Sequence, residues 1–260
     1  MADLPLNKPA GVLVKTTLVD FPGLVAGSFF LKGCNLRCPY CYNIGLVDPN
    51  ASEDDLNTIE ELFNHLKKRQ GILSGIVISG GEPTINPYTP VIIKKAKELG
   101  YKVKIDTNGI LPSKLRTFLE SDELRPDFIA MDIKTSPKKY SALLCPLNHS
   151  LNGTKKQISD ATKEVPDYIE EALKESAELV AAFPPDCREF RTVLVPPLIK
   201  KEDITNIAEI LPKDASWQFA QFRNENCLDP GYNDVSPYTD SEINELIDYA
   251  KTLIPGAALR

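Results

Sequence analysis

Three cysteines that lie close together in the sequence are the residues best suited to chemistry. Cys34, Cys38 and Cys41 have the spacing Cys-x3-Cys-x2-Cys and directly follow an apolar run at 24–31. Thiolates are soft ligands that bind zinc or iron–sulfur clusters. Both kinds of site usually take four protein ligands, and only three cysteines cluster here. A cubane cluster held by three cysteines has one iron without a protein ligand, and that iron can bind another molecule.

A zinc site on a non-catalytic scaffold is the alternative interpretation of this triplet. It would need a distant fourth ligand, and the sequence contains only two histidines, His65 and His149. The remaining cysteines, Cys145, Cys187 and Cys227, are scattered without ligand spacing, and we expect each to be an ordinary, partly buried residue. Taken alone, the triplet therefore leaves zinc and an iron–sulfur cluster both open.

Further polar or charged motifs lie at the ends of other apolar runs. They are Ser-Gly-Gly-Glu-Pro-Thr at 79–84, Asp-Thr-Asn-Gly at 106–109, Met-Asp-Ile-Lys at 131–134, and an arginine at 191 that begins an apolar run. Paired glycines let a backbone approach a ligand closely. The oxygens of Asp106, Thr107 and Asn108 could bind a ribose, an ammonium group or a hard cation. Arg191 needs an anionic partner, and a carboxylate-bearing ligand would serve.

Each motif also has a purely structural interpretation. Gly80 and Gly81 could form an ordinary turn between a strand and a helix. Asp106 could begin an Asx-type turn that caps the next helix. Lys134 could simply be a salt-bridge partner. The positions of the motifs within the fold therefore have to decide between these interpretations.

The elements that position these motifs form a regular repeat. Strand-like runs at 25–32, 75–79, 102–106, 127–133, 189–195 and 216–222 alternate with helix-like stretches at 55–69, 88–99, 113–121, 167–182, 203–211 and 239–253. This repeat predicts a parallel sheet with right-handed crossovers. In such sheets functional groups lie on loops at the carboxyl ends of strands. We therefore expect the cysteines and the later motifs to converge on one face.

The composition of the whole chain limits its class. We expect one domain over residues 1–260, with a core at about 24–225, an N-terminal extension at 1–23 and a C-terminal helix at about 239–253. The net charge of −6, with both signs mixed, argues against a nucleic-acid-binding surface. No signal peptide and no membrane span are apparent. We therefore expect a cytoplasmic protein without nucleic-acid or membrane partners. The polar stretch 135–166 is expected to be a surface excursion, with a functional role as the alternative.

Taken together, the motifs resemble the radical S-adenosylmethionine superfamily. The resemblance covers roughly residues 11–225 and rests on the cysteine triplet, with Tyr40 as its aromatic residue, followed by Gly-Gly-Glu-Pro at 80–83. It implies a partial (β/α)6 TIM-like barrel and a [4Fe–4S] cluster on Cys34, Cys38 and Cys41. S-adenosylmethionine would chelate the open iron. Electrons from a flavodoxin- or ferredoxin-type donor would then cleave it to methionine and a 5′-deoxyadenosyl radical.

Within that superfamily the chain is similar to the activating enzymes of glycyl-radical enzymes. The stretch Thr-Thr-Leu-Val-Asp-Phe-Pro-Gly at 16–23 resembles their Val-Asp-Gly-Pro-Gly opening, and the motifs at 106–109 and 132–134 match the same group. The closest sub-type is the activating protein of anaerobic ribonucleoside-triphosphate reductase. The resemblance implies an oxidoreductase that removes a hydrogen atom from a backbone glycine of a partner enzyme. The alternative is a radical enzyme that acts on a small molecule or peptide in biosynthesis.

The resemblance also implies roles for single residues. It places Gly80, Gly81 and Glu82 against the methionine amino group and backbone, and Lys134 and Arg191 near the methionine carboxylate. It groups Asn108 with these as cofactor-binding, and it places Tyr40 near the cluster or the adenine.

Two further roles and two departures complete the comparison. Asp106 and Thr107 resemble positions that, with the main chain of Ala130, can hold a monovalent cation. Asp20 corresponds to a position that meets the glycine-bearing loop of the partner. Tyr42 stands where these activating enzymes usually have histidine, and Phe21 replaces the first glycine of their opening motif. These departures weaken the assignment of the partner and leave the radical chemistry unaffected.

Overall fold

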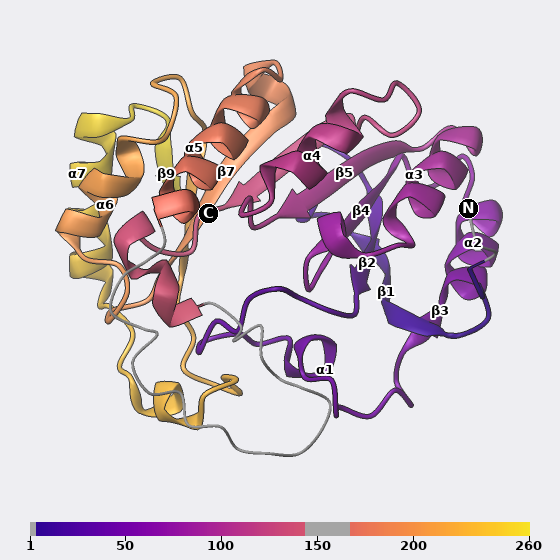
Figure 1. Cartoon of the computed structure of the whole chain (residues 1–260), viewed down its shortest axis with the longest axis horizontal. Coiled ribbons are helices and arrows are strands. Elements are labelled where there is room, and N and C mark those ends of the chain that lie inside the picture. Colours follow the sequence, from indigo (N-terminus) through magenta and orange to yellow (C-terminus); the bar gives the residue numbers. More distant parts are fainter. Residues whose placement is uncertain (1–3, 144–166) are drawn as a thin grey trace.

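The computed structural model describes residues 4–143 and 167–260 (Figure 1). Its strands are β1 (Pro9–Thr17), β2 (Ala26–Leu31), β3 (Asn57–Thr58), β4 (Gly75–Gly80), β5 (Lys102–Thr107), β6 (Phe128–Asp132), β7 (Arg188–Leu194), β8 (Trp217–Gln221) and β9 (Ala257–Leu259). Its α-helices are α1 (Ile44–Val47), α2 (Ile59–Lys68), α3 (Thr89–Glu98), α4 (Pro112–Leu119), α5 (Asp167–Ala181), α6 (Lys201–Ala208) and α7 (Asp240–Leu253). All the predicted strands and helices are confirmed, whereas β1, β3, β9 and α1 were not predicted.

All nine strands form one sheet, in the order β3-β1-β2-β4-β5-β6-β7-β8-β9. Neighbours are parallel from β2 through β9, and β1 is antiparallel to both of its neighbours. The sheet curves but does not close, because β3 and β9 are its two edges (Figure 1). The α/β fold with a partial TIM-like barrel is thus confirmed as an open barrel.

The two faces of the curved sheet differ in character. Alternate side chains of a strand point to opposite faces. On the outer face, apolar side chains such as Ile76, Ile78 and Val103 pack against α2 and α3, and those of β6 to β8 pack against α5 to α7. The inner face carries several polar and charged side chains, and they are Ser28, Lys104, Asp106, Asp132, Glu189, Arg191 and Gln218. The fold therefore directs charge into the concave side of the barrel.

Several helix ends follow signals that are visible in the sequence. Thr239 accepts a hydrogen bond from the backbone N–H of Glu242, and the Glu242 carboxylate accepts one from the backbone N–H of Thr239. This reciprocal capping box fixes the start of α7. Gly100, with φ of +83°, follows the end of α3 in the left-handed conformation that glycine adopts without strain.

The first part of the stretch 135–166 is not a surface excursion, which corrects the expectation for these residues. Pro137–Leu143 forms a 3-10 helix in which Tyr140 and Leu143 are fully buried. The backbone carbonyl of Leu143 accepts a hydrogen bond of 2.8 Å from the backbone N–H of Arg37. This segment is therefore part of the support of the cysteine loop. The remainder, including Cys145 and His149, lies outside the described residues.

Within the described part of the chain, no helix has both the length and the apolar character needed to cross a membrane.

Candidate functional site

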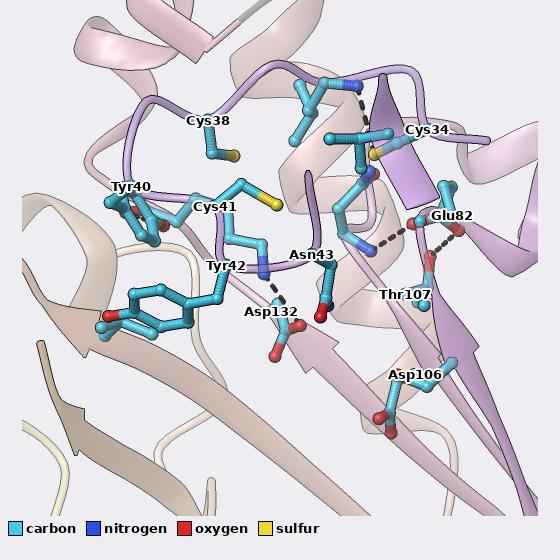
Figure 2. Close-up of a pocket in the computed structure, with 18 residues that line it drawn as sticks. Cys34, Cys38, Tyr40, Cys41, Tyr42, Asn43, Glu82, Asp106, Thr107 and Asp132 are labelled. Carbon is cyan, nitrogen blue, oxygen red and sulfur yellow. Dashed lines mark hydrogen bonds and ion pairs between the residues drawn. The ribbon is translucent and has the colours of Figure 1, made fainter. Parts of the chain in front are cut away.

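The three clustered cysteines lie on one loop that follows β2. Cys34, Cys38 and Cys41 all line the same cavity (Figure 2). Local hydrogen bonds shape the loop, since the backbone N–H of Leu36 donates to Cys34 Sγ at 3.4 Å and that of Cys41 donates to the Cys38 carbonyl at 3.0 Å. The Arg37 guanidinium donates to the Cys34 carbonyl at 2.9 Å. The loop is thus held in a curl that presents three sulfur atoms to one space.

This cavity, of about 180 Å³, gathers most of the predicted site residues. Those that line it are Cys34, Cys38, Tyr40, Cys41, Gly80, Gly81, Glu82, Asp106, Thr107, Asn108 and Lys134. Arg191 lines an adjoining hollow that shares Asp132, Lys134 and Val193 with the cavity. Asp20 lines neither, because it lies between β1 and β2, where its carboxylate accepts a hydrogen bond of 2.7 Å from Ser28.

The paired glycines bring the loops after β2 and β4 into contact. The backbone N–H groups of Gly81 and Glu82 donate to the carbonyls of Leu31 and Gly33 at 2.9 Å and 2.8 Å. A Cβ atom on Gly81 would lie 1.8 Å from the Gly33 carbonyl oxygen, and Gly80 has φ of +111°. The glycines are therefore required for a close approach between two segments of the chain itself. Because Cys34 directly follows Gly33, this contact also sets the position of Cys34.

Glu82 joins the β4 loop to the β5 loop. Its side chain is buried, and the carboxylate accepts hydrogen bonds from the hydroxyls of Thr84 at 2.6 Å and Thr107 at 2.7 Å, and from the backbone N–H of Asn108 at 2.7 Å. Burial raises the pKa of Glu82, and these hydrogen bonds oppose but do not cancel the increase. Both carboxylate oxygens are thus occupied by partners within the protein.

Asn35 is a site residue that sequence reasoning missed. The Asn108 side-chain amide donates to Asn35 Oδ1 at 2.8 Å, which links the β5 loop to the residue after Cys34. The Nδ2 atom of Asn35 is buried and has no hydrogen-bond partner among the described residues. A buried donor without an acceptor is costly, so this atom marks a place where a polar ligand would be stabilised. No sequence signal distinguishes Asn35 from an ordinary loop asparagine.

A chain of ion pairs crosses the inner face of the barrel below the cysteines. Arg191 Nε lies 2.5 Å from Asp132 Oδ1, and the Arg191 guanidinium lies 3.2 Å from Asp106 Oδ2. Lys134 Nζ lies 2.9 Å from Asp132 Oδ2. Burial alone would raise the pKa of Asp132, but Arg191 and Lys134 outweigh it and hold the pKa well below its usual range. The anionic partners that Arg191 needs are therefore supplied by the chain.

Lys104 is a second residue that sequence reasoning missed. Its side chain is fully buried, and its Nζ atom lies 3.1 Å from Glu189 Oε1 and 3.3 Å from Asp106 Oδ1. The same ammonium group donates to the backbone carbonyl of Asp20 at 2.6 Å. The alternation of β5 was the available signal, because a residue two positions before Asp106 shares its face.

Aromatic residues and the segment after β8 cover the cysteine loop. Tyr40 is buried and packs edge-on against Phe222, with ring centroids 6.5 Å apart. Tyr42, at the position of the first departure, accepts a hydrogen bond of 2.8 Å from the backbone N–H of Arg223. Further along, the backbone N–H of Leu228 donates to the Cys41 carbonyl at 3.0 Å. The Tyr42 hydroxyl therefore has a hydrogen-bond partner in the segment after β8.

The scattered cysteines do not join the site. Cys187 and Cys227 line neither the cavity nor the adjoining hollow, although Cys227 is buried in the segment that covers the cysteine loop. Phe21, at the second departure, packs edge-on against Phe128 with ring centroids 5.9 Å apart. It lies against Gly75 and Phe128, the first residues of β4 and β6, whereas the cysteine loop follows the carboxyl end of β2.

The donor set fits an iron–sulfur cluster better than a zinc ion. Burial raises the pKa of Cys34 to about 11 and that of Cys38 to about 12, so both need a metal partner to become thiolates near neutral pH. In residues 4–143 and 167–260 no three His, Cys, Asp or Glu side chains are arranged to hold a single ion. Cysteines of a cubane bind different irons and lie further apart than the ligands of one ion. His65 is engaged elsewhere, with Nε2 2.9 Å from the Lys15 carbonyl.

Comparison with curated proteins gives relatives with several different names. A Methanocaldococcus jannaschii protein named "Putative glycyl-radical enzyme activating enzyme" is 28% identical over 249 residues, which cover 95% of this chain and 94% of that protein. A Clostridium pasteurianum pyruvate formate-lyase-activating enzyme is 34% identical over 124 residues, 45% of this chain and 48% of that protein. An Aquifex aeolicus 7-carboxy-7-deazaguanine synthase is 38% identical over 89 residues, 34% of this chain and 38% of that protein.

Solved structures and a family model agree with the fold. Streptococcus suis SuiB superposes with a TM-score of 0.56 at 17% identity, over 90% of this chain and 46% of the SuiB chain. At this identity the likeness shows the fold alone, and the chain spans about half of the SuiB chain. The model of the Radical SAM superfamily matches residues 28–211, which include the cysteine loop and the motifs up to Arg191. With the cavity gathered around these motifs, the chain belongs to the radical SAM superfamily.

Proposed function

We propose that the protein activates a glycyl-radical enzyme by removing a hydrogen atom from a backbone glycine of that partner. The observation that carries this proposal is the similarity to the Methanocaldococcus relative, which extends over nearly the whole length of both chains. The open edge of the sheet supports it, because a protein loop needs a lateral entrance to the inner face. Anaerobic ribonucleoside-triphosphate reductase is the partner that the sequence motifs favour.

The cluster and S-adenosylmethionine would supply the electron transfer and the carbon-centred radical. In this proposal Cys34, Cys38 and Cys41 bind the cluster. Glu82 holds the loops after β4 and β5 in place, and Lys134 lies on the cavity wall where it can attract the methionine carboxylate. A flavodoxin- or ferredoxin-type protein is the proposed electron donor.

The remaining cofactor residues act in this proposal through their positions on the cavity wall. Gly80 and Gly81 present backbone groups beside the cysteine loop, and Asn108 fixes Asn35. Tyr40 is a buried residue of the cysteine loop itself and would limit access of water to the cluster.

Asp20 remains our candidate contact for the partner's glycine loop. Its neighbours Leu18 and Val19 are 74% and 70% exposed, which is unusual for large apolar side chains. An exposed apolar pair beside the amino end of the barrel suits a protein partner better than a small molecule.

The test is the formation of a glycyl radical in a partner. The reconstituted protein is mixed anaerobically with S-adenosylmethionine, a reductant and the glycyl-radical enzymes encoded in the same genome. We expect the doublet of a glycyl radical in electron paramagnetic resonance with one of them, and no doublet when its radical-bearing glycine is changed to alanine. Formation of 5′-deoxyadenosine without a doublet from any such enzyme would contradict the activating function.

A biosynthetic function is the second candidate, and one observation favours it. The similarity to the Aquifex 7-carboxy-7-deazaguanine synthase is higher in identity, although it covers only about a third of each chain. Gene neighbours discriminate between the two functions. A glycyl-radical enzyme encoded next door favours the first, and a biosynthetic cluster favours the second.

A further inference from the structure

The position expected for a monovalent cation is already occupied by charges of the protein. The expected ligands were Asp106, Thr107 and the main chain of Ala130. Asp106 Oδ1 lies 3.3 Å from Lys104 Nζ, and Asp106 Oδ2 lies 3.2 Å from the Arg191 guanidinium. The Thr107 hydroxyl donates to Glu82 at 2.7 Å and accepts from the backbone N–H of Gly109 at 3.2 Å. The Thr107 hydroxyl is therefore engaged within the chain, and each carboxylate oxygen of Asp106 faces a cation of the protein, although Oδ1 makes no hydrogen bond with the described residues.

The surroundings of Lys104 are built for a fixed positive charge. Its side chain has no exposed surface, and the ammonium group donates hydrogen bonds to the Asp20 carbonyl at 2.6 Å and to Glu189 at 3.1 Å and forms an ion pair with Asp106 Oδ1 at 3.3 Å. Lys104 pairs in the β5–β6 register with Phe128, whose ring centroid lies 5.5 Å from Nζ. A cation that is buried, paired and contacts an aromatic face is stably held.

The neighbouring register explains why the ammonium group can reach Asp106. The β6 residue opposite Asp106 is Ala130, and Ala130 pairs in turn with Glu189. The small side chain of Ala130 leaves space on the inner face between the two carboxylates. The side chains of Lys104, from β5, and Arg191, from β7, extend into this space. The two cations therefore approach Asp106 from two sides.

We propose that the Lys104 ammonium group takes the place of a monovalent metal ion beside Asp106, so that this enzyme binds S-adenosylmethionine without added Na⁺ or K⁺. Lys104 is a positioning residue, because it acts through Asp106. A free metal ion at the same place would be repelled by Lys104 and Arg191 in a site shielded from water. The inference rests on family membership and binding of the cofactor, and it is independent of which molecule donates the hydrogen atom.

The test replaces Na⁺ and K⁺ with choline at constant ionic strength and measures the affinity of the reconstituted protein for S-adenosylmethionine by calorimetry. We expect the wild-type affinity to change by less than about twofold. Lys104→Met should lose about tenfold or more in choline and recover most of it in K⁺ or NH₄⁺, because either ion can enter the vacated place. The thermal midpoint of Lys104→Met should likewise rise with K⁺ and not with choline.

Lys102→Met is the matched control, since Lys102 is an exposed lysine on the same strand that pairs with Asp127 at 2.7 Å. It should show no cation dependence. A wild-type protein that loses affinity about fivefold or more in choline would overturn the proposal. So would a folded Lys104→Met protein whose loss of affinity no monovalent cation restores. If Lys104→Met does not fold, the wild-type comparison decides alone. None of these measurements involves a partner enzyme, so they stand apart from the test of the activating function.

Discussion

Two of the three clustered thiols need a metal partner before they can act as thiolates near neutral pH. Cys34 and Cys38 are neutral thiols in their buried surroundings, because burial raises their pKa to about 11 and about 12. Ligation would exchange the proton of each thiol for an iron. Because the iron neutralises the thiolate charge, the sulfur atoms can stay buried without the free-energy cost of an unpaired buried charge.

The first prediction concerns these cysteines. Cys34→Ala, Cys38→Ala and Cys41→Ala should each abolish cleavage of S-adenosylmethionine and lower the iron and sulfide content of the reconstituted protein, because a cubane with fewer ligands is lost or unstable. Cys187→Ala is the matched control, since Cys187 lines neither the cavity nor the adjoining hollow. Iron analysis and 5′-deoxyadenosine assays check both. Full cleavage by any of the three loop variants would refute the assignment.

The second prediction concerns pH and Asp132. Its pKa in the folded protein is depressed, since Arg191 and Lys134 outweigh burial. The carboxylate therefore contributes stability that is complete above its unfolded pKa of about 3.9 and is lost as pH falls further. Asp132→Asn should cost about 3–5 kcal/mol at pH 7, because it leaves two cations without their shared partner.

Urea unfolding of the cluster-free protein at pH 7 and below pH 4 checks this effect. The difference between wild type and Asp132→Asn should shrink at the lower pH. Asp248→Asn is the control, because Asp248 forms an exposed pair with Lys251 that should contribute little. An equal cost of Asp132→Asn at both pH values would show that its carboxylate is not the source of the stability.

Site residues were predictable from sequence only where a motif of reactive or polar residues lies at the end of a predicted strand. The cysteines and the motifs at 79–84, 106–109 and 131–134 could be placed together because parallel strands end at one edge of a sheet. Lys104 was missed although strand alternation places it on the same face as Asp106, because a lysine two residues after Lys102 resembles the solvent-facing side of a strand. Its burial depends on Glu189, 85 residues further along the chain.

At the scale of elements, the contact between the loops after β2 and β4 gives the third prediction. Gly81→Ala should destabilise the protein by about 2 kcal/mol or more and weaken cluster assembly, because its Cβ would lie 1.8 Å from the Gly33 carbonyl. Gly45→Ala, in α1, is the matched control, since nothing lies within 4 Å of an added Cβ. Denaturation and iron content measure both effects. A fully stable Gly81→Ala protein would mean that the two loops can separate without cost.

The elements themselves were predictable where burial is continuous. The parallel strands β2 and β4 are largely apolar runs that are almost wholly buried, so they stand out in the sequence. In β1, by contrast, Val14, Lys15 and Thr16 are exposed, and the apolar pattern is interrupted. β9 has only three residues, too few for a period to appear. Both are recognisable only from their pairing with β2 and β8.

For the whole molecule, the open sheet leaves a path along its inner face. The hollow beside the cysteine cavity shares Asp132, Lys134 and Val193 with that cavity. It shares Gln218 and Arg260 with a third hollow, which Val19 and Pro22 line at the amino end of the barrel. A chain segment that entered near the exposed Leu18–Val19 pair could thus reach the cysteines.

This path gives the fourth prediction, which rests on the proposed activating function. Ala220→Trp should narrow the middle hollow, which has a volume of about 220 Å³ and is lined by Ala220. We expect cleavage of S-adenosylmethionine in the absence of partner to stay within about twofold, and radical formation on the partner to fall by about tenfold or more, because a protein segment needs the width that the indole ring would take. Glu245→Trp, which adds the same ring on an exposed part of α7, should change neither rate. Quantified 5′-deoxyadenosine and radical spin separate the two rates, and an Ala220→Trp protein that activates its partner normally would show that the glycine reaches the cavity by another route.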